Sequence, residues 1–291
     1  MLNRKNNFPS ITGSTRVFGL IGNPVSHSLS PKFWNAALAA TEIDAVYLAF
    51  DVAEAETTAA LNGLSALNVC GINVTRPLKQ QASSFCRLLH EPARSTGVVN
   101  TIKFGKIGGE GWNTDVTGLQ RILARIHQVS GGTTILGSGA SSITALWALK
   151  PSQPRKIFQI ARKFSEQYGH QISDDFIKNK HCPADMAITR LAWNNKNFAY
   201  ALEESDIIIN TTPLGWSSED YIPEFDKHLD KGKVFIDFNY APESKLVASA
   251  RNRGCVVIDG RELLFEQGIE SFSLLTGREA PADVIRSCIY S

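Results

Sequence analysis

The sequence predicts an α/β protein with two domains. Short apolar runs that indicate buried strands alternate with helical segments, a pattern typical of sheets whose strands are mainly parallel. The alternation occurs twice, first from about residue 17 and again from about residue 115. The predicted strands are 17–22, 45–51 and 70–74 in the first run, and 133–136, 156–160, 206–210, 234–237 and 256–258 in the second.

Helix signals lie between the strands of the first run. Ser30 followed by Pro31 is typical of a helix N-terminus, with Ser30 as the N-cap and Pro31 in the first turn. Residues 54–65 are a second predicted helix. We therefore expect the first domain to be a mostly parallel sheet covered by helices.

The second run predicts a doubly wound sheet. A helix over 115–125 leads into it, and another helix ends near Leu149. Residues 165–198 are polar and irregular, and we assign them no element. Two C-terminal helices, 261–275 and 282–290, are expected to return to the first domain. The expected domains are therefore residues 1–114 together with 260–291, and residues 115–259.

The composition is that of an ordinary globular protein. Of the 291 residues, 43% are hydrophobic, which is enough apolar material for two cores. The net charge of +2 argues against a protein that coats nucleic acid, because such proteins are usually more basic. The polar N-terminus and the lack of an apolar stretch approaching ~18 residues predict no signal peptide and no transmembrane helix.

The cysteines predict neither a disulfide framework nor a metal site. They are odd in number, scattered, and never arranged as Cys-x-x-Cys, which favours reduced thiols in a cytoplasmic protein. No Cys/His group has the spacing of metal ligands. The five are Cys70, Cys86, Cys182, Cys255 and Cys288.

A glycine turn follows the first strand of the second run. Gly137, Ser138, Gly139 and Ala140 lie directly between a predicted strand and a predicted helix. In this context the first glycine allows a tight turn, the second allows close approach of a pyrophosphate, and the helix N-terminus favours an anion. Ser142 stands at the third position of the fingerprint, where Gly or Ala is usual. We therefore predict a dinucleotide site, the alternative being an ordinary glycine turn.

The end of the next strand indicates which dinucleotide binds. An NAD enzyme usually carries an acidic residue about 20 residues after the glycines, to bind the ribose 2′-hydroxyl. Here Arg162 and Lys163 take that place, and two cations would attract a 2′-phosphate. We predict NADP as the cofactor, unless the two side chains are only a solvated surface pair.

Polar segments follow several predicted strands. Because ligands bind beyond the carboxyl ends of strands in open α/β sheets, we expect these segments to contribute to one site. Hydroxyls, amides, an ammonium and a carboxylate are the groups that suit a small polyhydroxylated substrate. The segments are 26–30 (SHSLS), 73–79 (NVTRPLK), 99–101 (VNT) and 112–115 (WNTD).

These segments resemble the motifs of the shikimate dehydrogenase family, which includes shikimate and quinate dehydrogenases. The resemblance extends from about Val17 to the C-terminus and contains many motifs in the same order. The matching stretches are SHSLSP, NVTRPLK, VVNTI, GWNTD, NTTPLG at 210–215, the G-x-x-L-L-x-x-Q pattern at 260–267, and LLTG near the end.

The resemblance implies a Rossmann-like second domain and roles for individual residues. Lys79 and Asp115 correspond to the catalytic pair of the family. The implied substrate-binding residues are Ser28, Ser30, Thr75, Asn100, Tyr240 and Gln267. Cofactor contacts are expected from Gly137, Ser138, Gly139, Ala140, Arg162, Lys163, Thr212, Pro213 and Gly260.

The implied reaction is the reversible reduction of 3-dehydroshikimate to shikimate. Hydride passes between nicotinamide C4 and the ring carbon, and Lys79 carries the proton to or from the oxygen. Asp115 is expected to orient Lys79 and balance its charge. Because a lysine amine must lose its proton before it acts as a base, we expect oxidation to be faster at alkaline pH.

Several positions depart from the family pattern. Trp34 replaces a frequent His, Leu275 replaces a common Trp, and Ala161 replaces the Asn of the Asn-Arg-Thr motif. Arg76 stands where a small aliphatic residue is common. Its side chain is predicted either to contact the substrate carboxylate or to point to solvent.

Other functions fit parts of the same pattern. One is a quinate or quinate/shikimate dehydrogenase that uses NAD or both cofactors. A second is a non-catalytic NADP-binding sensor, against which Lys79 and Asp115 argue. A third is another small-acid dehydrogenase, such as a tetrahydrofolate enzyme, although the serine-rich loop favours a polyol. We expect a small-molecule substrate, no nucleic-acid or membrane partner, and a monomer or homodimer.

Overall fold

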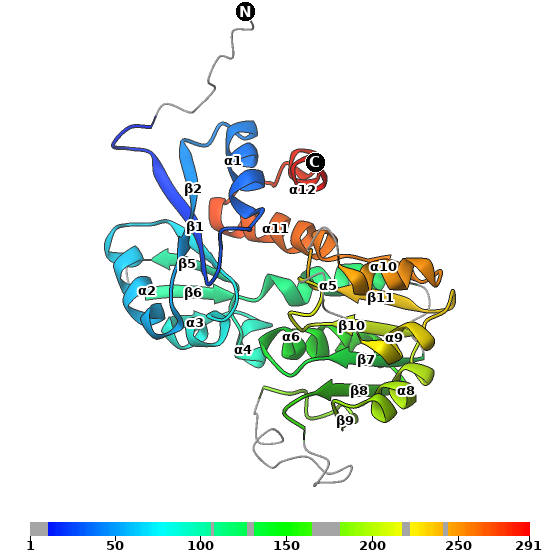
Figure 1. Cartoon of the computed structure of the whole chain (residues 1–291). Helices are drawn as coiled ribbons and strands as arrows, with labels where there is room; N and C mark the ends of the chain where they lie inside the picture. Colours follow the sequence, from blue (N-terminus) through cyan, green and yellow to red (C-terminus); the bar gives the residue numbers. More distant parts are fainter. Residues whose placement is uncertain (1–10, 106–107, 127–130, 165–180, 217–221, 241–243) are drawn as a thin grey trace, which may run out of the picture. The chain divides into compact units, whose positions relative to one another are not determined.

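The computed structural model describes residues 11–105, 108–126, 131–164, 181–216, 222–240 and 244–291 (Figure 1). The chain divides into two compact units. Unit 1 contains the chain up to His90 together with Val99–Trp112 and Gly268–Ser291. Unit 2 contains Glu91–Val98 and Asn113–Gln267.

Unit 1 is built on a mixed sheet with strand order β2-β1-β3-β5-β6-β4. Three of its described pairings are parallel, and β5 is antiparallel to both β3 and β6. The three strands expected from the sequence are present, whereas β4, β5 and β6 were not predicted. The strands are β1 (Arg16–Gly22), β2 (Ala45–Asp51), β3 (Gly71–Val74), β4 (Cys86–Leu89), β5 (Thr101–Gly105) and β6 (Gly108–Trp112).

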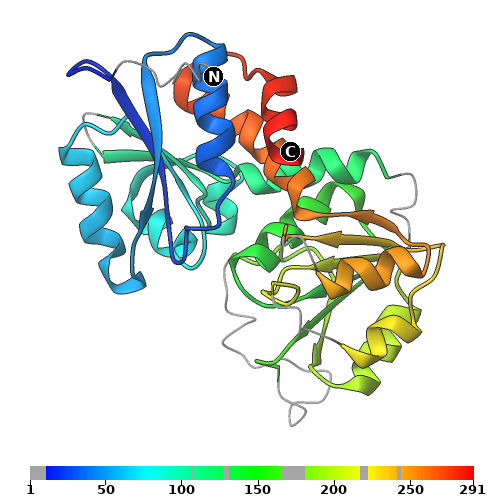
Figure 2. The ribbon, with the colours of Figure 1, turned by 45° about the horizontal axis from the view of Figure 1, so that its top comes forward.

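The first and last helices of the described chain both belong to unit 1. Figures 1 and 2 show α1 beside α12, and the two helices are in contact. The predicted helix over 54–65 is a 3-10 turn (Glu54–Glu56) followed by α2. The helices are α1 (Ser30–Ala40), α2 (Thr57–Ala66), α3 (Lys79–Phe85) and α12 (Ala282–Tyr290).

The predicted N-cap of α1 is wrong by one residue. Leu29 is the N-cap, and Ser30 is the first residue of the helix. The hydroxyl of Ser28 accepts a hydrogen bond from the Ser30 backbone N–H at 3.2 Å, so an upstream serine satisfies one of the free donors of the first turn.

Two departures from the family pattern lie in the core of unit 1. The Trp34 ring is 1% exposed and stacks on Tyr47 with ring centroids 4.7 Å apart. It also packs against Phe272, whose ring centroid lies 5.1 Å away. Leu275 is 4% exposed. Both substitutions therefore change the packing of buried apolar side chains.

Unit 2 is built on an all-parallel sheet with strand order β12-β11-β10-β7-β8-β9. This order confirms the predicted doubly wound sheet, and the direction of winding reverses between β7 and β10. The strands are β7 (Gly132–Leu136), β8 (Lys156–Ala161), β9 (Ile188–Ala192), β10 (Ile207–Asn210), β11 (Val234–Asp237) and β12 (Val256–Ile258). β9 lies in the stretch to which no element was assigned, and residues 165–180 of that stretch are outside the described residues.

Helices cover both faces of this sheet (Figure 2). Ile207 and Ile209 of β10 pack in one core cluster with residues of α5 and α6, whereas Ile208 packs in another with residues of α8, α9 and α10. This alternation buries both faces, as the continuous apolar run predicts. The helices are α4 (Ala93–Thr96), α5 (Thr114–Ala124), α6 (Ala140–Leu149), a 3-10 turn (Lys150–Ser152), α8 (Asn195–Glu203), α9 (Pro223–Lys227) and α10 (Lys245–Asn252), and α11 (Gly260–Thr276) begins in unit 2 and continues into unit 1 from Gly268. None of the helices described is long and apolar enough to cross a membrane.

Candidate active site

The serine loop follows β1 in unit 1. Ser28 is half-buried, and its backbone N–H donates to the Val25 carbonyl at 3.0 Å. Ser30 is 7% exposed, at the first position of α1. The hydrogen bond from Ser30 N–H to the Ser28 hydroxyl holds these two predicted substrate-binding residues together.

The predicted catalytic lysine begins α3. Lys79 is half-buried, and its carbonyl accepts a hydrogen bond from the Val99 N–H at 3.0 Å. Thr75 lies between β3 and α3, and its N–H donates to the Ile21 carbonyl at 2.9 Å. Gly22 leaves room for this loop, because a Cβ atom there would lie 2.2 Å from Thr75 Cγ2. The neighbouring Arg76 side chain is exposed.

A buried hydrogen-bond network supports Asn100. Asn73 donates through its amide to the Asn100 carbonyl at 3.2 Å and to the Ser271 hydroxyl at 2.6 Å. The Tyr47 hydroxyl donates to Asn73 Oδ1 at 2.9 Å. Burial raises the pKa of Tyr47 well above its ordinary value, against the opposing effect of a hydrogen bond with Ser30. Tyr47 therefore stays a neutral donor that is linked to Ser30 directly and to the Asn100 carbonyl through Asn73.

The first turn of α5 carries the predicted catalytic aspartate in unit 2. Asp115 is 8% exposed. It is the second residue of the helix, and Asn113 is the N-cap. Gln267, the last residue of unit 2, is half-buried, and its Oε1 accepts a hydrogen bond from the Thr114 hydroxyl at 3.4 Å. The residue that contacts Gln267, Thr114, therefore directly precedes Asp115 in α5.

The glycine turn joins β7 to α6, as predicted. Gln159 of β8 is fully buried and donates to the Gly137 carbonyl at 3.0 Å and to the Ser142 hydroxyl at 3.2 Å. Ser142 donates in turn to the Gly139 carbonyl at 2.7 Å. The serine that departs from the fingerprint therefore helps to hold the turn in place.

The two glycines of the turn have different surroundings. Gly137 has a φ of +118°, and a Cβ atom there would lie 2.6 Å from the Thr211 hydroxyl oxygen. This glycine is needed by the protein itself. Gly139 has an extended backbone (φ −91°, ψ −168°), and a Cβ atom would meet nothing within 4 Å. No described protein atom explains a glycine here, whereas a pyrophosphate against the start of α6 would.

The predicted 2′-phosphate contacts lie at the carboxyl end of β8. Arg162 and Lys163 are both exposed. The Arg162 guanidinium carbon lies 5.6 Å from the centroid of the Trp193 ring, a cation–π contact that orients it. An exposed and oriented guanidinium suits a phosphate group.

A buried carboxyl group organises the loop that carries Thr212 and Pro213. Asp237 Oδ1 accepts hydrogen bonds from Asn210 Nδ2 at 3.0 Å and from the Asn239 backbone N–H at 2.9 Å. Asn239 Nδ2 also donates to the Thr212 carbonyl at 2.9 Å. Burial raises the pKa of Asp237 to about 7, although hydrogen bonds from Asn239, Asn210 and Ser244 lower it.

Two further predicted residues lie beside this loop. Gly260 packs against the backbone that leads out of β11, because a Cβ atom there would lie 2.6 Å from the Asn239 carbonyl carbon. Tyr240 is half-buried and packs edge-on against Trp216, with ring centroids 5.3 Å apart. Among the described residues, no group of His, Cys, Asp or Glu side chains suits a metal ion.

Within each unit, the predicted residues fall into small groups. Unit 1 holds Ser28, Ser30, Thr75, Lys79 and Asn100. Unit 2 holds Gly137, Ser138, Gly139, Ala140, Arg162, Lys163, Thr212, Pro213, Asp115, Tyr240, Gly260 and Gln267.

Sequence reasoning missed the buried polar residues that support these groups. Gln159 and Asp237 lie within or at the end of apolar strands, where a polar residue is a detectable signal. Tyr47 and Ser271 gave no such signal.

The fold and the glycine turn together define the class. An all-parallel sheet with this strand order, and a glycine turn at the start of the helix after its first strand, make unit 2 a Rossmann-type dinucleotide-binding fold. Residues 20–102 match the family model of the shikimate dehydrogenase substrate binding domain.

Relatives match over almost the entire chain. A protein of Thermococcus kodakarensis named shikimate dehydrogenase (NADP(+)) is 36% identical over 94% of this chain and 95% of its own length. The crystal structure of shikimate dehydrogenase from Aquifex aeolicus, 31% identical, superposes with a TM-score of 0.83 over 97% of this chain and 100% of that one. A shikimate dehydrogenase in complex with NADP+, 29% identical, gives a TM-score of 0.81 over 96% of both chains. The chain belongs to the shikimate dehydrogenase family.

Proposed function

We propose that this protein is an NADP-dependent shikimate dehydrogenase that reduces 3-dehydroshikimate to shikimate reversibly, a step of aromatic amino-acid (chorismate) biosynthesis. The observation that carries the proposal is the similarity of nearly the whole chain to relatives named shikimate dehydrogenase (NADP(+)), several at 32–36% identity. The polar groups at the strand ends, which suit a polyol, support the same substrate.

The proposed substrate contacts come from polar side chains of both units. In unit 1 the groups are the Ser28 and Ser30 hydroxyls, the Thr75 hydroxyl and the Asn100 amide. Tyr240 and Gln267 are the contributions of unit 2. Asn100 is 3% exposed, and its Oδ1 accepts a hydrogen bond from the Thr101 hydroxyl at 3.1 Å, which preorganises its amide for a substrate hydroxyl.

Lys79 is the proposed proton carrier. During reduction its ammonium donates a proton to the oxygen as negative charge develops there, and during oxidation its amine accepts the proton. Asp115 is the proposed partner that orients the ammonium and balances its charge. Burial of Asp115 at 8% exposure favours this role, since a carboxylate shielded from water interacts more strongly with a cation.

The residues of unit 2 fit NADP. When bound, NADP supplies the carbon that gives or takes the hydride. Open space at Gly139 and the N-terminus of α6 suit a pyrophosphate. Arg162 and Lys163 suit a 2′-phosphate, and the orienting contact with Trp193 supports this assignment. Ser138, Ala140, Thr212, Pro213 and Gly260 are the remaining proposed cofactor contacts.

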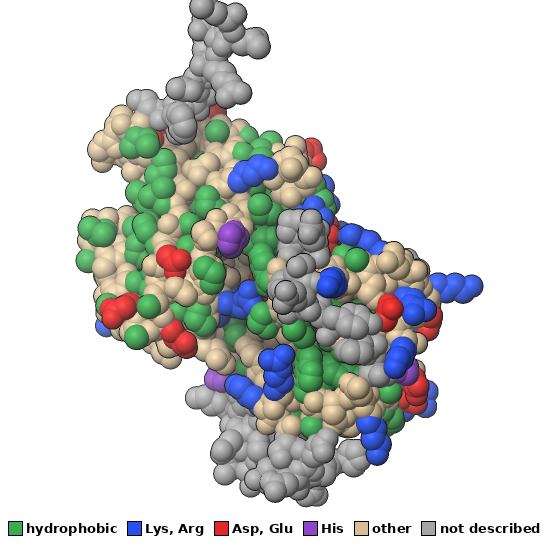
Figure 3. All heavy atoms as spheres, in the orientation of Figure 1, with side chains coloured by type: hydrophobic (Ala, Val, Ile, Leu, Met, Phe, Trp, Pro, Cys, Tyr) green, Lys and Arg blue, Asp and Glu red, His purple; other side chains and the backbone are tan. Residues whose placement is uncertain are grey.

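We also propose the domain roles, partners and location of the protein. Residues 1–114 with 260–291 would bind the substrate, and residues 115–259 the cofactor. Charges of both signs are dispersed over the face drawn in Figure 3, and the net charge is only +2, which supports a protein without a nucleic-acid partner. Five free cysteines support a cytoplasmic location, in a monomer or homodimer.

An initial-rate assay tests the proposed function. The full chain is mixed with shikimate or quinate and with NADP or NAD, and reduced nicotinamide is followed by absorbance. We expect the highest kcat/KM for shikimate with NADP. A higher value for quinate with NAD would indicate a quinate dehydrogenase. NADP binding without turnover of either acid would indicate a sensor.

The two glycines of the turn give a second test. Gly139→Ala is expected to raise KM for NADP at least about tenfold, because its methyl group would occupy space next to the pyrophosphate. Melting temperature and KM for shikimate should stay unchanged, since the methyl group meets no protein atom.

Gly137→Ala is the matched control for this test. A positive φ and the close Thr211 hydroxyl predict a loss of stability of about 1–3 kcal/mol. An unchanged KM for NADP in folded Gly139→Ala would argue against a pyrophosphate at this turn.

A further inference from the structure

We propose that Glu266 is a positioning residue: it holds the proposed substrate-binding residue Gln267 against α5 and thereby sets the affinity for substrate. The inference rests on the proposed function, because Gln267 is assigned to the substrate only there. Glu266 itself is 8% exposed and forms ion pairs with Arg121 and Arg125.

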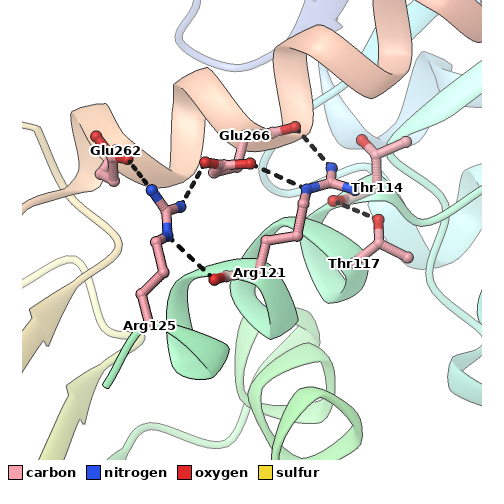
Figure 4. A network of polar contacts seen from close by, with 6 residues as sticks. All are labelled: Thr114, Thr117, Arg121, Arg125, Glu262 and Glu266. Carbon is pink, nitrogen blue, oxygen red and sulfur yellow. Dashed lines mark hydrogen bonds and ion pairs between the residues drawn. The ribbon is translucent and has the colours of Figure 1, made fainter. Parts of the chain in front are cut away.

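The guanidinium groups of Arg121, in α5, and of Arg125, the C-cap residue of α5, hold Glu266 in one position (Figure 4). Arg121 Nε donates to Glu266 Oε2 at 2.9 Å, and Arg121 Nη2 donates to the Glu266 carbonyl at 2.9 Å. Arg125 Nη2 donates to Glu266 Oε1. Both carboxylate oxygens and the backbone carbonyl of Glu266 are therefore bound to side chains of α5 and its C-cap residue. Charge-assisted hydrogen bonds of this kind are stronger and more directional than neutral ones.

Gly118 shows independently that α5 and α11 approach closely at the same place. A Cβ atom on Gly118 would lie 3.1 Å from Gln267 N and 3.3 Å from Glu266 Cβ. The backbone of α11 thus lies directly on the glycine of α5 where Gln267 begins. Any larger side chain at position 118 would push Gln267 by a few tenths of an ångström.

The side chain of Gln267 is oriented by the same helix pair. Its Oε1 accepts from the Thr114 hydroxyl at 3.4 Å, and its Nε2 donates to the Leu264 carbonyl at 2.9 Å. Thr114 is the first residue of α5 and directly precedes Asp115. The hydrogen bonds of Glu266 to Arg121 and Arg125 therefore fix the amide of Gln267 relative to the first turn of α5, which carries Asp115.

The same network offers a matched control. Glu262 lies one turn earlier on α11 and accepts from Arg125 Nη1 at 3.1 Å. Its side chain is 19% exposed, and that of Arg125 is 53% exposed, so this pair lies nearer to solvent. Figure 4 shows that Glu262 contacts only Arg125 among the residues drawn. Loss of the Glu262 charge should leave the hydrogen bonds between Arg121 and Glu266 in place.

The test compares Glu266→Gln with Glu262→Gln in the full-length protein, with shikimate and NADP as the probes. Glu266→Gln is expected to raise KM for shikimate about tenfold, the effect of one misplaced substrate hydrogen bond. KM for NADP should change less than about twofold, as should all constants of Glu262→Gln. Gly118→Ala should give the same selective rise with every charged group retained.

A double-mutant cycle separates positioning from general damage. If Glu266 acts through Gln267, Glu266→Gln should cause no further rise in KM for shikimate in a Gln267→Ala background. Additive effects would overturn the inference, as would unchanged KM values in both Glu266→Gln and Gly118→Ala. If instead the wild-type protein does not oxidise shikimate with NADP, the proposed function itself is wrong.

Discussion

Replacing Lys79 with alanine is expected to lower kcat for shikimate oxidation by about 10²–10⁴-fold, because the proton would lose its carrier. Alanine is a good helix former, so α3 should still begin at this position. NADP binding should persist, since the proposed cofactor contacts all lie in unit 2. The measurement is kcat with saturating shikimate and NADP, beside the dissociation constant for NADP.

Lys32→Ala is the matched control, because Lys32 is an exposed lysine of the same unit that bonds to the Ser291 hydroxyl at 2.7 Å. Its kcat should stay within about twofold of the wild type. In the wild type, kcat for oxidation should rise from neutral to alkaline pH, because only the neutral amine of a lysine accepts a proton. A Lys79→Ala variant with near-normal turnover would reject this residue as the proton carrier.

Asp237→Asn is expected to make the stability of the protein less sensitive to pH. The folded pKa of about 7 lies above the ordinary 3.8, so the folded protein binds a proton that the unfolded chain has lost. The contribution of this group is therefore fully present below pH ~4 and is lost as pH rises toward ~7. At about 1.36 kcal/mol for each pKa unit, the total is at most ~4 kcal/mol.

Urea unfolding at several pH values between 4 and 8 measures this effect. The free energy of unfolding of Asp237→Asn, relative to the wild type, should increase with pH over that interval and then level off. Asn keeps an oxygen that can accept the bonds from Asn210 and Asn239. A difference in the free energy of unfolding between the variant and the wild type that does not change with pH would contradict the raised pKa of Asp237.

Asp226→Asn is a control in which the effect on stability should change with pH in the opposite direction. Hydrogen bonds from Ser249 and Arg253 lower the pKa of the Asp226 carboxyl. Its stabilisation is therefore present above the unfolded pKa and is lost as pH falls. Removing this carboxylate should destabilise the protein more at neutral than at acidic pH, the reverse of the trend for Asp237→Asn.

Strands with strong local patterns could be predicted from the sequence alone. The apolar runs at Val234–Asp237 and Val256–Ile258 match β11 and β12 residue for residue. β6 could not be predicted, because Gly108–Trp112 is rich in glycine and its pairing depends on β5. β9 was missed, since polar Thr and Arg residues interrupt its apolar pattern.

The candidate site divides in the same way. Motif residues such as Lys79 and Gly139 could be chosen from the sequence, and their roles stay predictions. The supporting contacts could not be predicted from the sequence, because they join distant segments. Asn73 and Ser271, for example, are 198 residues apart in the chain. The effect of Trp34 was also outside the reach of sequence patterns, since only the packing shows it stacked on Tyr47.

The contact between Arg162 and Trp193 has a practical consequence for spectroscopy. An indole beneath a guanidinium emits fluorescence that depends on the position of that cation. A phosphate that draws Arg162 away from the ring, whose centroid lies 5.6 Å from the guanidinium carbon, would change the emission of Trp193. If Arg162 binds the 2′-phosphate as proposed, Trp193 would be a built-in optical reporter of cofactor binding, also in variants that no longer turn over.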